Sequence, residues 1–453
     1  MTSLNNIKYF LDNFEVYNGQ TALIWHNISY TYSQLLSRIN HWRITLKEFP
    51  QGTIVGIESD FSPETIAILF TLIEKNVIVV PLDIKHSNKN SKKIEIAQLD
   101  YLIKVINEDE INIVKISPPI DEKNDLYKII KQKVVSGLVL FTSGSSGEPK
   151  GALHDFSKLL AKFHVKRNAL LTINFLLFDH WGGLNTLFHI LSNGGTVVVL
   201  EYRNPNYVCE LIEKYKAELL PTSPTFLNML VLSRAYERHS LKSLKVISYG
   251  AEPMPESLLK HLNTIFPDIK LQQTYGLIEL GVMRSQSQDN GSLWVKIGGE
   301  GYQTRVVDGI LQIKSDSAML GYLNATSPFT EDGWFITGDS VEVDGEYFKI
   351  LGRKSEIINV GGEKVFPQEV ENVILEIPDI IDVMVYAESN ALTGKIVCAK
   401  IKYSGTETKA EVVKKVKTYC RTKLESFKVP VKIDLVDTTF ESNRFKKSRV
   451  NGN

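Results

Sequence analysis

The feature that most constrains the fold is an alternation of short β-branched runs with stretches of helical apolar spacing. Thr53–Glu58 (TIVGIE) and Val77–Pro81 (VIVVP) are short and rich in β-branched residues, which is typical of buried strands. Between them, Ser62–Lys75 carries apolar residues at helical spacing. A strand, a helix and a second strand in this order form a βαβ unit with parallel strands. The sequence therefore predicts an α/β fold built on parallel sheets.

The same pattern continues to about residue 290. The further runs predicted as strands between helices are Val134–Phe141, Gly195–Leu200, Ala217–Leu220 and Leu244–Ser248. The polar segment after Pro81 (DIKHSNKNSKK) lacks apolar periodicity, and we expect it to be a surface stretch before the next helix.

Two changes of pattern divide the rest of the chain. From Trp294 to Leu351, Asp-Gly turn signals separate short strands, as in antiparallel hairpins. Beyond Arg353 the pattern predicts a domain-sized unit of about 100 residues. Its expected helices are Val370–Ile377 and Ala410–Leu424, and its expected strands are Ile381–Tyr386, Ile396–Ile401 and Val431–Leu435.

Charge and cysteine content exclude several classes of protein. The 453 residues include 52 Lys and Arg and 52 Asp and Glu, and this balance argues against a nucleic acid as the main partner. The three cysteines lie far apart and form neither a disulfide framework nor a CxxC metal pair, which indicates a reducing compartment. From the first residues given we expect no signal peptide, and no apolar run approaches the roughly 20 residues of a membrane span. We therefore expect a cytoplasmic protein without a membrane span.

The first segment that suggests chemistry is Phe141–Gly151 (FTSGSSGEPKG), directly after a predicted strand. Glycines allow backbone N–H groups to close around phosphate oxygens, and hydroxyl side chains add donors. Lys150 supplies positive charge, although the spacing is not that of a Walker A loop. The alternative is a flexible Ser/Gly surface loop, which composition alone would favour.

Five further motifs follow in a fixed order: Ser248–Pro253 (SYGAEP), Gln272–Glu279 (QQTYGLIE), Gly333–Asp339 (GWFITGD), Gly352–Glu369 (GRKSEIINVGGEKVFPQE) and Asn443–Arg449 (NRFKKSR). Each motif alone is weak, but the ordered set is specific. From about residue 20 to about residue 450 the chain resembles the adenylate-forming superfamily of acyl-CoA synthetases, stand-alone adenylation domains and luciferases, the AMP-dependent synthetases and ligases.

The resemblance implies a two-lobed α/β fold. Residues 1–352 would form a large N-terminal lobe of parallel-rich sheets with helices and a small β-barrel-like subdomain, containing the ATP and acyl pockets. Residues 353–453 would form a small mobile α+β lid lobe with its hinge near Ser355. The family usually has Asp or Lys at the hinge, but a hinge needs only to absorb backbone rotation. Gly361 and Gly362 would line the pantetheine tunnel after this rotation.

The resemblance also implies the nucleotide-binding residues. The phosphate loop would hold the β- and γ-phosphates through Thr142, Ser143, Gly144, Ser145, Ser146, Gly147 and Lys150. Glu279 matches the acidic residue that helps to hold Mg²⁺, a cation that prefers oxygen ligands. The alternative for Glu279 is a solvated surface charge.

The adenosine moiety would be bound by two further groups of residues. Tyr275, between Thr274 and Gly276, matches the aromatic residue that stacks on adenine, and Gly250, Ala251 and Glu252 match the segment on the other side. Tyr275 could instead be an ordinary core aromatic. Asp339 matches the carboxylate that accepts hydrogen bonds from both ribose hydroxyls, with a plain turn aspartate as the alternative. Arg353 matches the arginine that also reaches the ribose.

The C-terminal motif implies the catalytic lysine of the first step. The family usually shows Thr-x-x-Gly-Lys-x-x-Arg, and placing Lys446 in register puts Phe445 in the position of the glycine and keeps Arg449. Lys447 is the competing register. A basic solvated chain end is the alternative to both.

One departure from the family pattern and one match to it concern the acid and its activation. Ile278 occupies a position that usually carries Thr or Ser, so a hydrogen bond near the α-phosphate worth about 0.5–1.5 kcal/mol is absent. Phe178–Leu184 (FDHWGGL) matches a segment that places His180 at the mouth of the acyl pocket, with Trp181 as apolar wall. Amino-acid-activating domains have a Phe-Asp pair here, which Phe178 and Asp179 would also satisfy. The His-x-Gly-Gly continuation favours a non-amino acid, and a structural histidine is the alternative for His180.

The sequence therefore predicts an acid–thiol ligase of the acyl-CoA synthetase type. It would use ATP and Mg²⁺ to convert a small-molecule carboxylic acid into acyl-AMP and pyrophosphate. It would then transfer the acyl group to CoA or to the phosphopantetheine of an acyl carrier protein. Catalysis would depend on positioning and on charge stabilisation by Lys446, Glu279 and His180. The alternatives are an amino-acid adenylation domain that loads a carrier protein and a degenerate adenylate-binding relative without activity.

Overall fold

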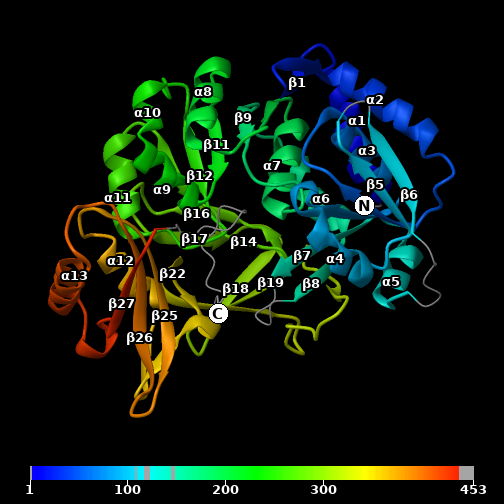
Figure 1. Ribbon diagram of the computed structural model, residues 1–453. Helices are drawn as coiled ribbons and strands as arrows, with labels where there is room; N and C mark the ends of the chain where they lie inside the picture. Colours follow the sequence, from blue (N-terminus) through cyan, green and yellow to red (C-terminus); the bar gives the residue numbers. More distant parts are fainter. Residues whose placement is uncertain (1–2, 108–109, 117–122, 144–147, 438–453) are drawn as a thin grey trace.

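The computed structural model describes residues 3–107, 110–116, 123–143 and 148–437 (Figure 1). The predicted α/β class is confirmed. Two seven-stranded sheets with helices make up the larger N-terminal region, followed by a six-stranded antiparallel sheet and a smaller C-terminal region.

The first sheet has the order β13-β12-β11-β9-β10-β1-β2, and all its neighbours are parallel except β1 and β2. Its strands are β1 Thr21–Trp25, β2 Ile28–Thr31, β9 Leu171–Asn174, β10 Thr196–Val199, β11 Leu219–Thr222, β12 Val246–Tyr249 and β13 Lys270–Gln273. The short β-branched runs predicted in this region therefore form strands, with ends shifted by a few residues.

The second sheet has the order β20-β8-β7-β4-β3-β5-β6, with a parallel centre and antiparallel outer strands. Its strands are β3 Ile54–Glu58, β4 Ile78–Leu82, β5 Tyr101–Val105, β6 Ile111–Lys115, β7 Gly137–Ser143, β8 Pro149–Asp155 and β20 Gly321–Tyr322. The predicted βαβ unit is confirmed, because β3 and β4 are parallel neighbours joined by α3 (Pro63–Glu74). Ser62 caps this helix and Pro63 occupies its first turn, as expected at a helix start.

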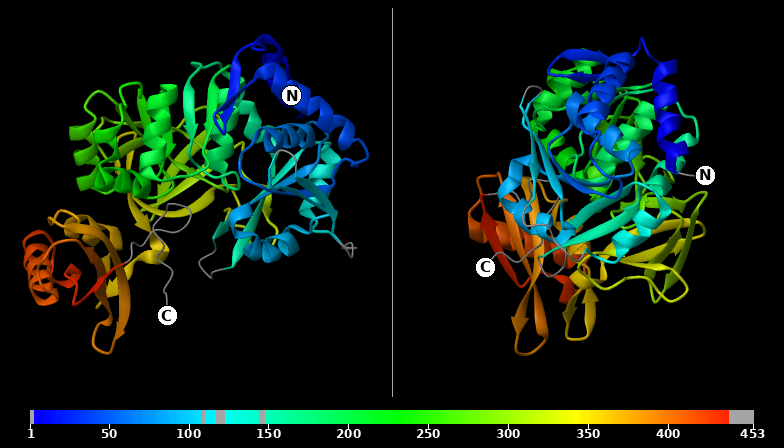
Figure 2. Two further views of the ribbon diagram at one scale, coloured as in Figure 1. Left: turned by 45° about the horizontal axis from the view of Figure 1, so that its top comes forward. Right: turned by 90° about the vertical axis from the view of Figure 1, so that its right-hand side faces the viewer.

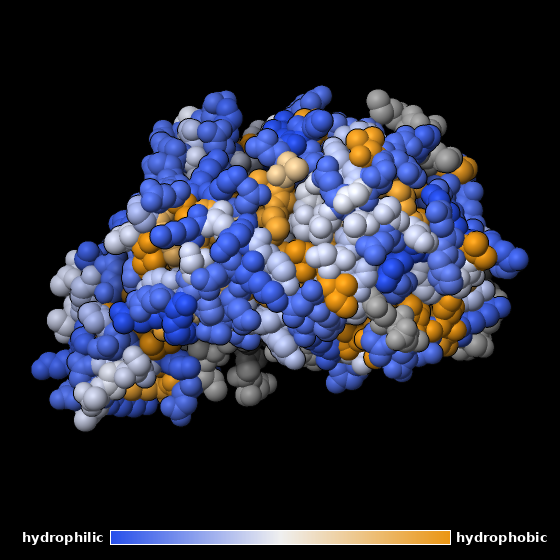
Figure 3. All heavy atoms as spheres, turned by 90° about the horizontal axis from the view of Figure 1, so that it is seen from above, coloured by the Kyte–Doolittle hydropathy of each residue, from blue (hydrophilic) through white to orange (hydrophobic). Residues whose placement is uncertain are grey.

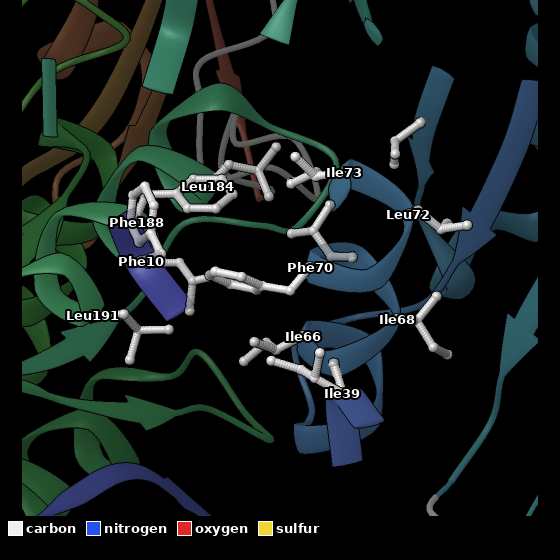
Figure 4. Close-up of a cluster of buried hydrophobic side chains, with 14 of the residues drawn as sticks. Phe10, Ile39, Ile66, Ile68, Phe70, Leu72, Ile73, Leu184, Phe188 and Leu191 are labelled. Carbon is white, nitrogen blue, oxygen red and sulfur yellow. The ribbon is translucent and has the colours of Figure 1, made fainter. Parts of the chain in front are cut away.

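The helices around these two sheets pack into separate apolar clusters, and the largest of these clusters joins helices of both sheets. Besides α3 the helices are α1 Ser3–Val16, α2 Tyr32–Thr45, α4 Asn90–Ala97, α5 Leu126–Lys133, α6 Phe156–Ala161, α7 Trp181–Ser192, α8 Pro205–Tyr215, α9 Pro224–Ser233, α10 Ala235–Arg238 and α11 Glu256–Ile265. Figure 4 shows Phe10, Phe70 and Phe188 from α1, α3 and α7 meeting in the largest cluster, where ring centroids lie 5.5–5.8 Å apart. This contact ties the helices of one sheet to those of the other.

One prediction in this region is partly wrong. The polar stretch after Pro81 contains a 3₁₀ helix, Ile84–Lys89, followed by α4. Asn90 in this stretch is buried, because its side-chain amide donates hydrogen bonds to Glu58 and to the carbonyl of Asp83 at 2.7 and 2.8 Å. The polar composition of this stretch therefore did not indicate that Asn90 is buried and hydrogen-bonded.

The predicted antiparallel hairpins form a six-stranded sheet in the order β16-β17-β22-β21-β19-β18. The strands are β16 Arg284–Ser287, β17 Trp294–Gly298, β18 Tyr302–Val307, β19 Ile310–Ser315, β21 Phe335–Asp344 and β22 Tyr347–Arg353. Asp308 and Gly309 have φ of 51° and 73°, the positive values that a tight hairpin turn requires. A short hairpin, β14 Gly276–Leu277 and β15 Gly281–Val282, precedes this sheet.

The C-terminal region has a core of its own, built from residues 358–433. Its elements are β23 Ile358–Val360, β24 Glu363–Val365, α12 Pro367–Ile374, β25 Ile380–Asn390, β26 Gly394–Tyr403, α13 Lys409–Lys423 and β27 Lys432–Val436. These elements lie at one end of the molecule, below α9 and α11 in Figure 1 and far from the N-terminal helices in Figure 2. Asn228 of α9 donates a hydrogen bond to the carbonyl of Ile381 at 3.2 Å, which joins the two regions.

Candidate functional site

Asp339 is the centre of a buried polar cluster between the hairpin β21–β22 and the end of β13. Antiparallel pairing places Asp339 opposite Arg353, and Arg353 Nε lies 2.8 Å from Asp339 Oδ1. The Tyr275 hydroxyl donates to Asp339 Oδ2 at 2.5 Å. Both carboxylate oxygens are therefore oriented by donors, and Asp339 is not a plain turn residue.

The electrostatics of this cluster follow from burial. Burial raises the pKa of the Asp339 carboxyl above its usual value, although the Arg353 guanidinium and the Tyr275 hydroxyl act in the opposite direction. Burial and the neighbouring Asp339 raise the pKa of Tyr275 well above its usual value. The phenol therefore stays protonated and remains a hydrogen-bond donor. These hydrogen-bonding positions on Asp339 suit replacement by the two hydroxyl groups of a ribose.

Glu279 lies in the turn between β14 and β15, close to this cluster. Its side chain is buried, and the Tyr322 hydroxyl donates a hydrogen bond to Glu279 Oε1. The charge of Glu279 also contributes to the raised pKa of Asp339, as expected for two neighbouring carboxylates. Glu279 is therefore not the solvated surface charge of the alternative interpretation.

The predicted phosphate loop joins two paired strands. In the hairpin β7–β8, Thr142 is opposite Lys150, so the two ends of the loop are held side by side. Lys150 Nζ lies 5.6 Å from the ring centroid of Tyr322, which is a cation–π contact. Residues 144–147, and with them four of the predicted phosphate-binding residues, lie outside the described residues, as does the side chain of Ser143.

A cavity of about 240 Å³ brings these groups together. It is lined by Lys150, Leu277, Glu279, Tyr322, Thr326, Ser327, Pro328, Phe335, Ile336, Thr337 and Arg353. Two cations, Lys150 and Arg353, and one carboxylate, Glu279, thus line one cavity although they come from three distant motifs. Arg353 also contacts the Tyr275–Asp339 pair. Such a set can bind an anionic ligand that also carries hydroxyl groups.

The segment predicted on the other side of adenine lies at the carboxyl ends of two parallel strands, β12 and β13. A Cβ on Gly250 would lie 2.4 Å from Thr274 Oγ1, so this position requires glycine. Ala251 has φ of 70°, an uncommon backbone conformation for a residue other than glycine. Glu252 accepts a hydrogen bond from the backbone N–H of Thr225 at 2.7 Å and thereby caps α9. The ends of parallel strands are the usual ligand site of such sheets.

The segment around His180 is organised by the start of α7. His180 is the N-cap residue, and its Nδ1 accepts a hydrogen bond from the backbone N–H of Gly182 at 3.1 Å. A Cβ on Gly183 would lie 2.3 Å from the carbonyl oxygen of Leu177, so no larger residue fits. Phe178 and Trp181 are buried. Helix capping therefore accounts for much of this motif, and the role of His180 at an acyl pocket stays a prediction.

Asp179 is buried beside His180 and pairs with a lysine that the sequence did not point to. Asp179 Oδ2 lies 3.4 Å from Lys93 Nζ of α4, and only 3% and 11% of the two side chains are exposed. Lys93 belongs to the polar stretch that was expected on the surface. Nothing in a run such as NSKK distinguishes a buried partner from a solvated lysine.

Ile278 is packed rather than directed into solvent. Its side chain is partly buried and contacts the two apolar clusters on either side of β14 and β15. The apolar residue at this position therefore has a packing role, whatever its effect on a nucleotide.

The C-terminal predictions are tested less completely. Ser355 is exposed in a 3₁₀ turn, Lys354–Glu356, directly after β22, and Gly361 and Gly362 form the β23–β24 turn with φ of 61° and 98°. Phe445, Lys446, Lys447 and Arg449 lie outside the described residues. The hinge and the catalytic lysine stay predictions.

Within the described part of the chain, no group of three or more Asp, Glu, His or Cys side chains could hold a metal ion. Over the same residues, no helix combines the length and the apolar character that crossing a bilayer requires. The face of the molecule in Figure 3 is mainly polar, with apolar side chains in small separate groups. The sequence interpretation missed several residues of the cavity, namely Tyr322, Thr326, Ser327 and Pro328. For Tyr322 the reason is that a Gly-Tyr pair alone carries no distinctive signal.

Comparisons with known proteins cover nearly the whole chain. The family model described as AMP-binding enzyme matches residues 10–323, and the AMP-binding enzyme C-terminal domain matches residues 369–447. Indoleacetate–CoA ligase of Aromatoleum aromaticum is 29% identical over 297 residues, which cover 58% of this chain and 56% of that protein.

Long-chain-fatty-acid–CoA ligase FadD13 of Mycobacterium tuberculosis is 26% identical over 320 residues, which cover 65% of this chain and 62% of that protein. The chain thus matches only 56–62% of the length of these two curated relatives. Among solved structures, ATP-bound MatB from Rhodopseudomonas palustris superposes with a TM-score of 0.81 at 20% identity, over 98% of this chain and 97% of that chain. At this identity the likeness establishes the fold.

Proposed function

Because this chain belongs to the AMP-binding enzyme family, we propose that it is an AMP-forming ligase that joins a carboxylic acid to CoA through an acyl-adenylate. The observation that carries the proposal is the cavity described above. It combines Lys150, Glu279 and Arg353 with the Asp339 carboxylate directly behind them. This set offers contacts for phosphates and for a ribose diol in one place.

The first step would activate the acid. A carboxylate oxygen attacks the α-phosphorus of ATP, and pyrophosphate leaves with the electrons of the broken P–O bond. Lys150 and the loop between β7 and β8 would bind the β- and γ-phosphates. Asp339 would accept hydrogen bonds from the ribose hydroxyls in place of its present contacts, and Arg353 would also reach the ribose. Positioning and fixed charges of this kind supply most of the catalysis in phosphoryl transfer.

The residues present also suit Mg²⁺. Enzymes commonly hold this ion through one or two carboxylates together with the phosphates of the substrate, rather than in a cage made only of protein. Glu279 offers a buried carboxylate at the cavity that Lys150 also lines. Glu279 would therefore hold Mg²⁺, which neutralises phosphate charge when it is bound.

The second step would transfer the acyl group to a thiol. The CoA sulfur attacks the acyl carbon, and AMP leaves with the oxygen that came from the acid. We propose that residues 353–453 form a lid lobe that turns near Ser355 between the two steps. The separate core of residues 358–433 and the exposed turn at Ser355 support this division. CoA as the acceptor is supported by the names of the curated relatives.

The acid is proposed to lack an α-ammonium group. Asp179 is the carboxylate that could pair with such a group, but it is already paired with Lys93. A second cation at Asp179 would have to displace Lys93 from a site in which both side chains are buried, which is costly. The pair therefore favours a simple acyl or aryl acid over an amino acid.

The test is pyrophosphate release from ATP with a panel of acyl, aryl and amino acids, with and without CoA. The proposal expects release with a non-amino acid, and turnover that increases on addition of CoA. Release confined to amino acids and independent of CoA would favour an adenylation domain that loads a carrier protein. No release with any acid, although ATP binds, would favour a degenerate relative. Ile278 and Phe445 are the residues that keep this last alternative open.

A further inference from the structure

Tyr322 contacts two oppositely charged side chains of the cavity, Lys150 and Glu279. Tyr322 and Gly321 form β20, which pairs with β8 so that Tyr322 is opposite Ala152. Lys150 lies two residues before Ala152 on the same strand. The position of the tyrosine is therefore fixed by backbone hydrogen bonds to the strand that carries the lysine.

The two parts of the Tyr322 side chain contact groups of opposite charge. The face of the ring lies 5.6 Å from Lys150 Nζ, and the hydroxyl donates to Glu279 Oε1. All three side chains line the same cavity.

Lys150 and Glu279 both contact Tyr322. No ion pair within 4.0 Å joins them in the described part of the chain, although both lie in contact with one tyrosine. Opposite charges in a partly desolvated cavity attract strongly. A direct Lys150–Glu279 ion pair would compete with the proposed binding of phosphate by Lys150 and of Mg²⁺ by Glu279. Tyr322 instead contacts the Lys150 cation with its ring and donates a hydrogen bond to the Glu279 carboxylate with its hydroxyl.

We propose that Tyr322 is a positioning residue that separates Lys150 from Glu279 and thereby keeps both available for magnesium-bound ATP. This inference rests on the proposed function, since it assumes that Glu279 and Lys150 bind the metal and the phosphates. Tyr322 acts through these two residues and does not itself take part in the chemistry. Its removal should therefore affect ATP and Mg²⁺ and leave the acid unaffected.

The test compares Tyr322→Phe, which keeps the ring and removes the hydroxyl, with Tyr322→Leu, which removes both. We expect the Kd for ATP, measured by calorimetry at fixed Mg²⁺, to rise about tenfold in the first variant, the effect of one charge-assisted hydrogen bond. The rise should be larger in the second. At saturating ATP, the KM of the acid should change by less than about threefold, and added Mg²⁺ should partly restore the ATP affinity of the Phe variant. Tyr419→Phe is the matched control. Tyr419 lies on α13, and its hydroxyl also donates a hydrogen bond to a glutamate, Glu376, at 2.6 Å. Neither residue lines the cavity.

A double-mutant comparison separates positioning from a general structural role. In a Glu279→Gln background, Tyr322→Phe should add less than about twofold to the loss of ATP affinity, because the charged partner is gone. An equal loss in both backgrounds, or an unchanged Kd in Tyr322→Phe and Tyr322→Leu, overturns the inference while ATP binding by the wild type stands. Failure of the wild type to bind magnesium-bound ATP overturns both this inference and the proposed function.

Discussion

The two sides of the candidate site use their buried charges in different ways. On the nucleotide side, Lys150, Glu279 and Arg353 line a cavity, and Asp339 lies directly behind them. On the side proposed for the acid, Asp179 is paired with Lys93, and His180 accepts a backbone hydrogen bond at the start of α7. The first set can exchange its present contacts for those of a ligand. The second set makes contacts within the protein, so we expect the acid to be recognised by shape and apolar contact rather than by charge.

The largest expected effect concerns Lys446, the residue proposed as the catalytic lysine of the first step. Lys446→Ala should slow acyl-adenylate formation by about 100- to 1000-fold, the usual cost of losing one group that stabilises transition-state charge. Thioester formation from supplied acyl-adenylate should be affected much less, because the lid lobe would carry this lysine away after the first step. The measurement is the rate of each half-reaction.

Lys447→Ala is the matched control for this prediction. It should leave both half-reactions within a few-fold of the wild type. Equal losses in the two half-reactions for Lys446→Ala would contradict the assignment, and a selective loss in Lys447→Ala would move the role to the neighbouring residue.

A smaller effect is expected at Asp339. Asp339→Asn should lower kcat/KM for ATP about 10- to 100-fold, since charge-assisted hydrogen bonds to the ribose contribute roughly 1.5–3 kcal/mol. The KM of the acid should not change. Dideoxy-ATP, which lacks both ribose hydroxyls, provides the control. If the variant discriminates against dideoxy-ATP as strongly as the wild type does, Asp339 does not bind the ribose.

Substitution of Ile278 tests whether the absence of a hydroxyl near the expected α-phosphate slows acyl-adenylate formation. Ile278→Thr restores a hydroxyl near the expected α-phosphate and should speed acyl-adenylate formation by up to about tenfold, equivalent to 1.4 kcal/mol. Ile278→Val is the control, because valine has the shape of threonine without the hydroxyl. The single-turnover rates of both variants decide the question. A similar gain in the Val variant would show that packing, and not the hydroxyl, limits the rate.

The smallest effect is expected on the acid side. Asp179→Asn should change kcat/KM for the preferred acid by only a few-fold, because the carboxylate is paired internally with Lys93. Lys93→Met should have a similarly small effect on the acid and should lower the thermal midpoint, since it leaves Asp179 buried without its cation. A loss of a hundredfold or more in Asp179→Asn, confined to α-amino acids, would reverse the comparison and favour an amino-acid adenylation domain.

Sequence patterns predicted the fold well because its signals are local. Val77–Pro81 was predicted as a strand from five neighbouring residues, and β4 covers Ile78–Leu82. Separate motifs singled out Lys150, Glu279 and Arg353, and the fold brings these three residues to one cavity. What the sequence did not reveal are partners from distant segments. Tyr322 lies 43 residues from Glu279 and Lys93 lies 86 residues from Asp179, and neither has a distinctive local pattern.

The central claim is that the acid is activated as an acyl-adenylate before thiol transfer. An acid labelled with ¹⁸O in its carboxylate tests this claim directly, because one carboxylate oxygen becomes the bridge to the α-phosphorus and leaves with AMP. Mass spectrometry of the products with ATP, Mg²⁺ and CoA should find one ¹⁸O in AMP, one in the thioester and none in pyrophosphate. AMP without the label, or label in inorganic phosphate with formation of ADP, would contradict the claim.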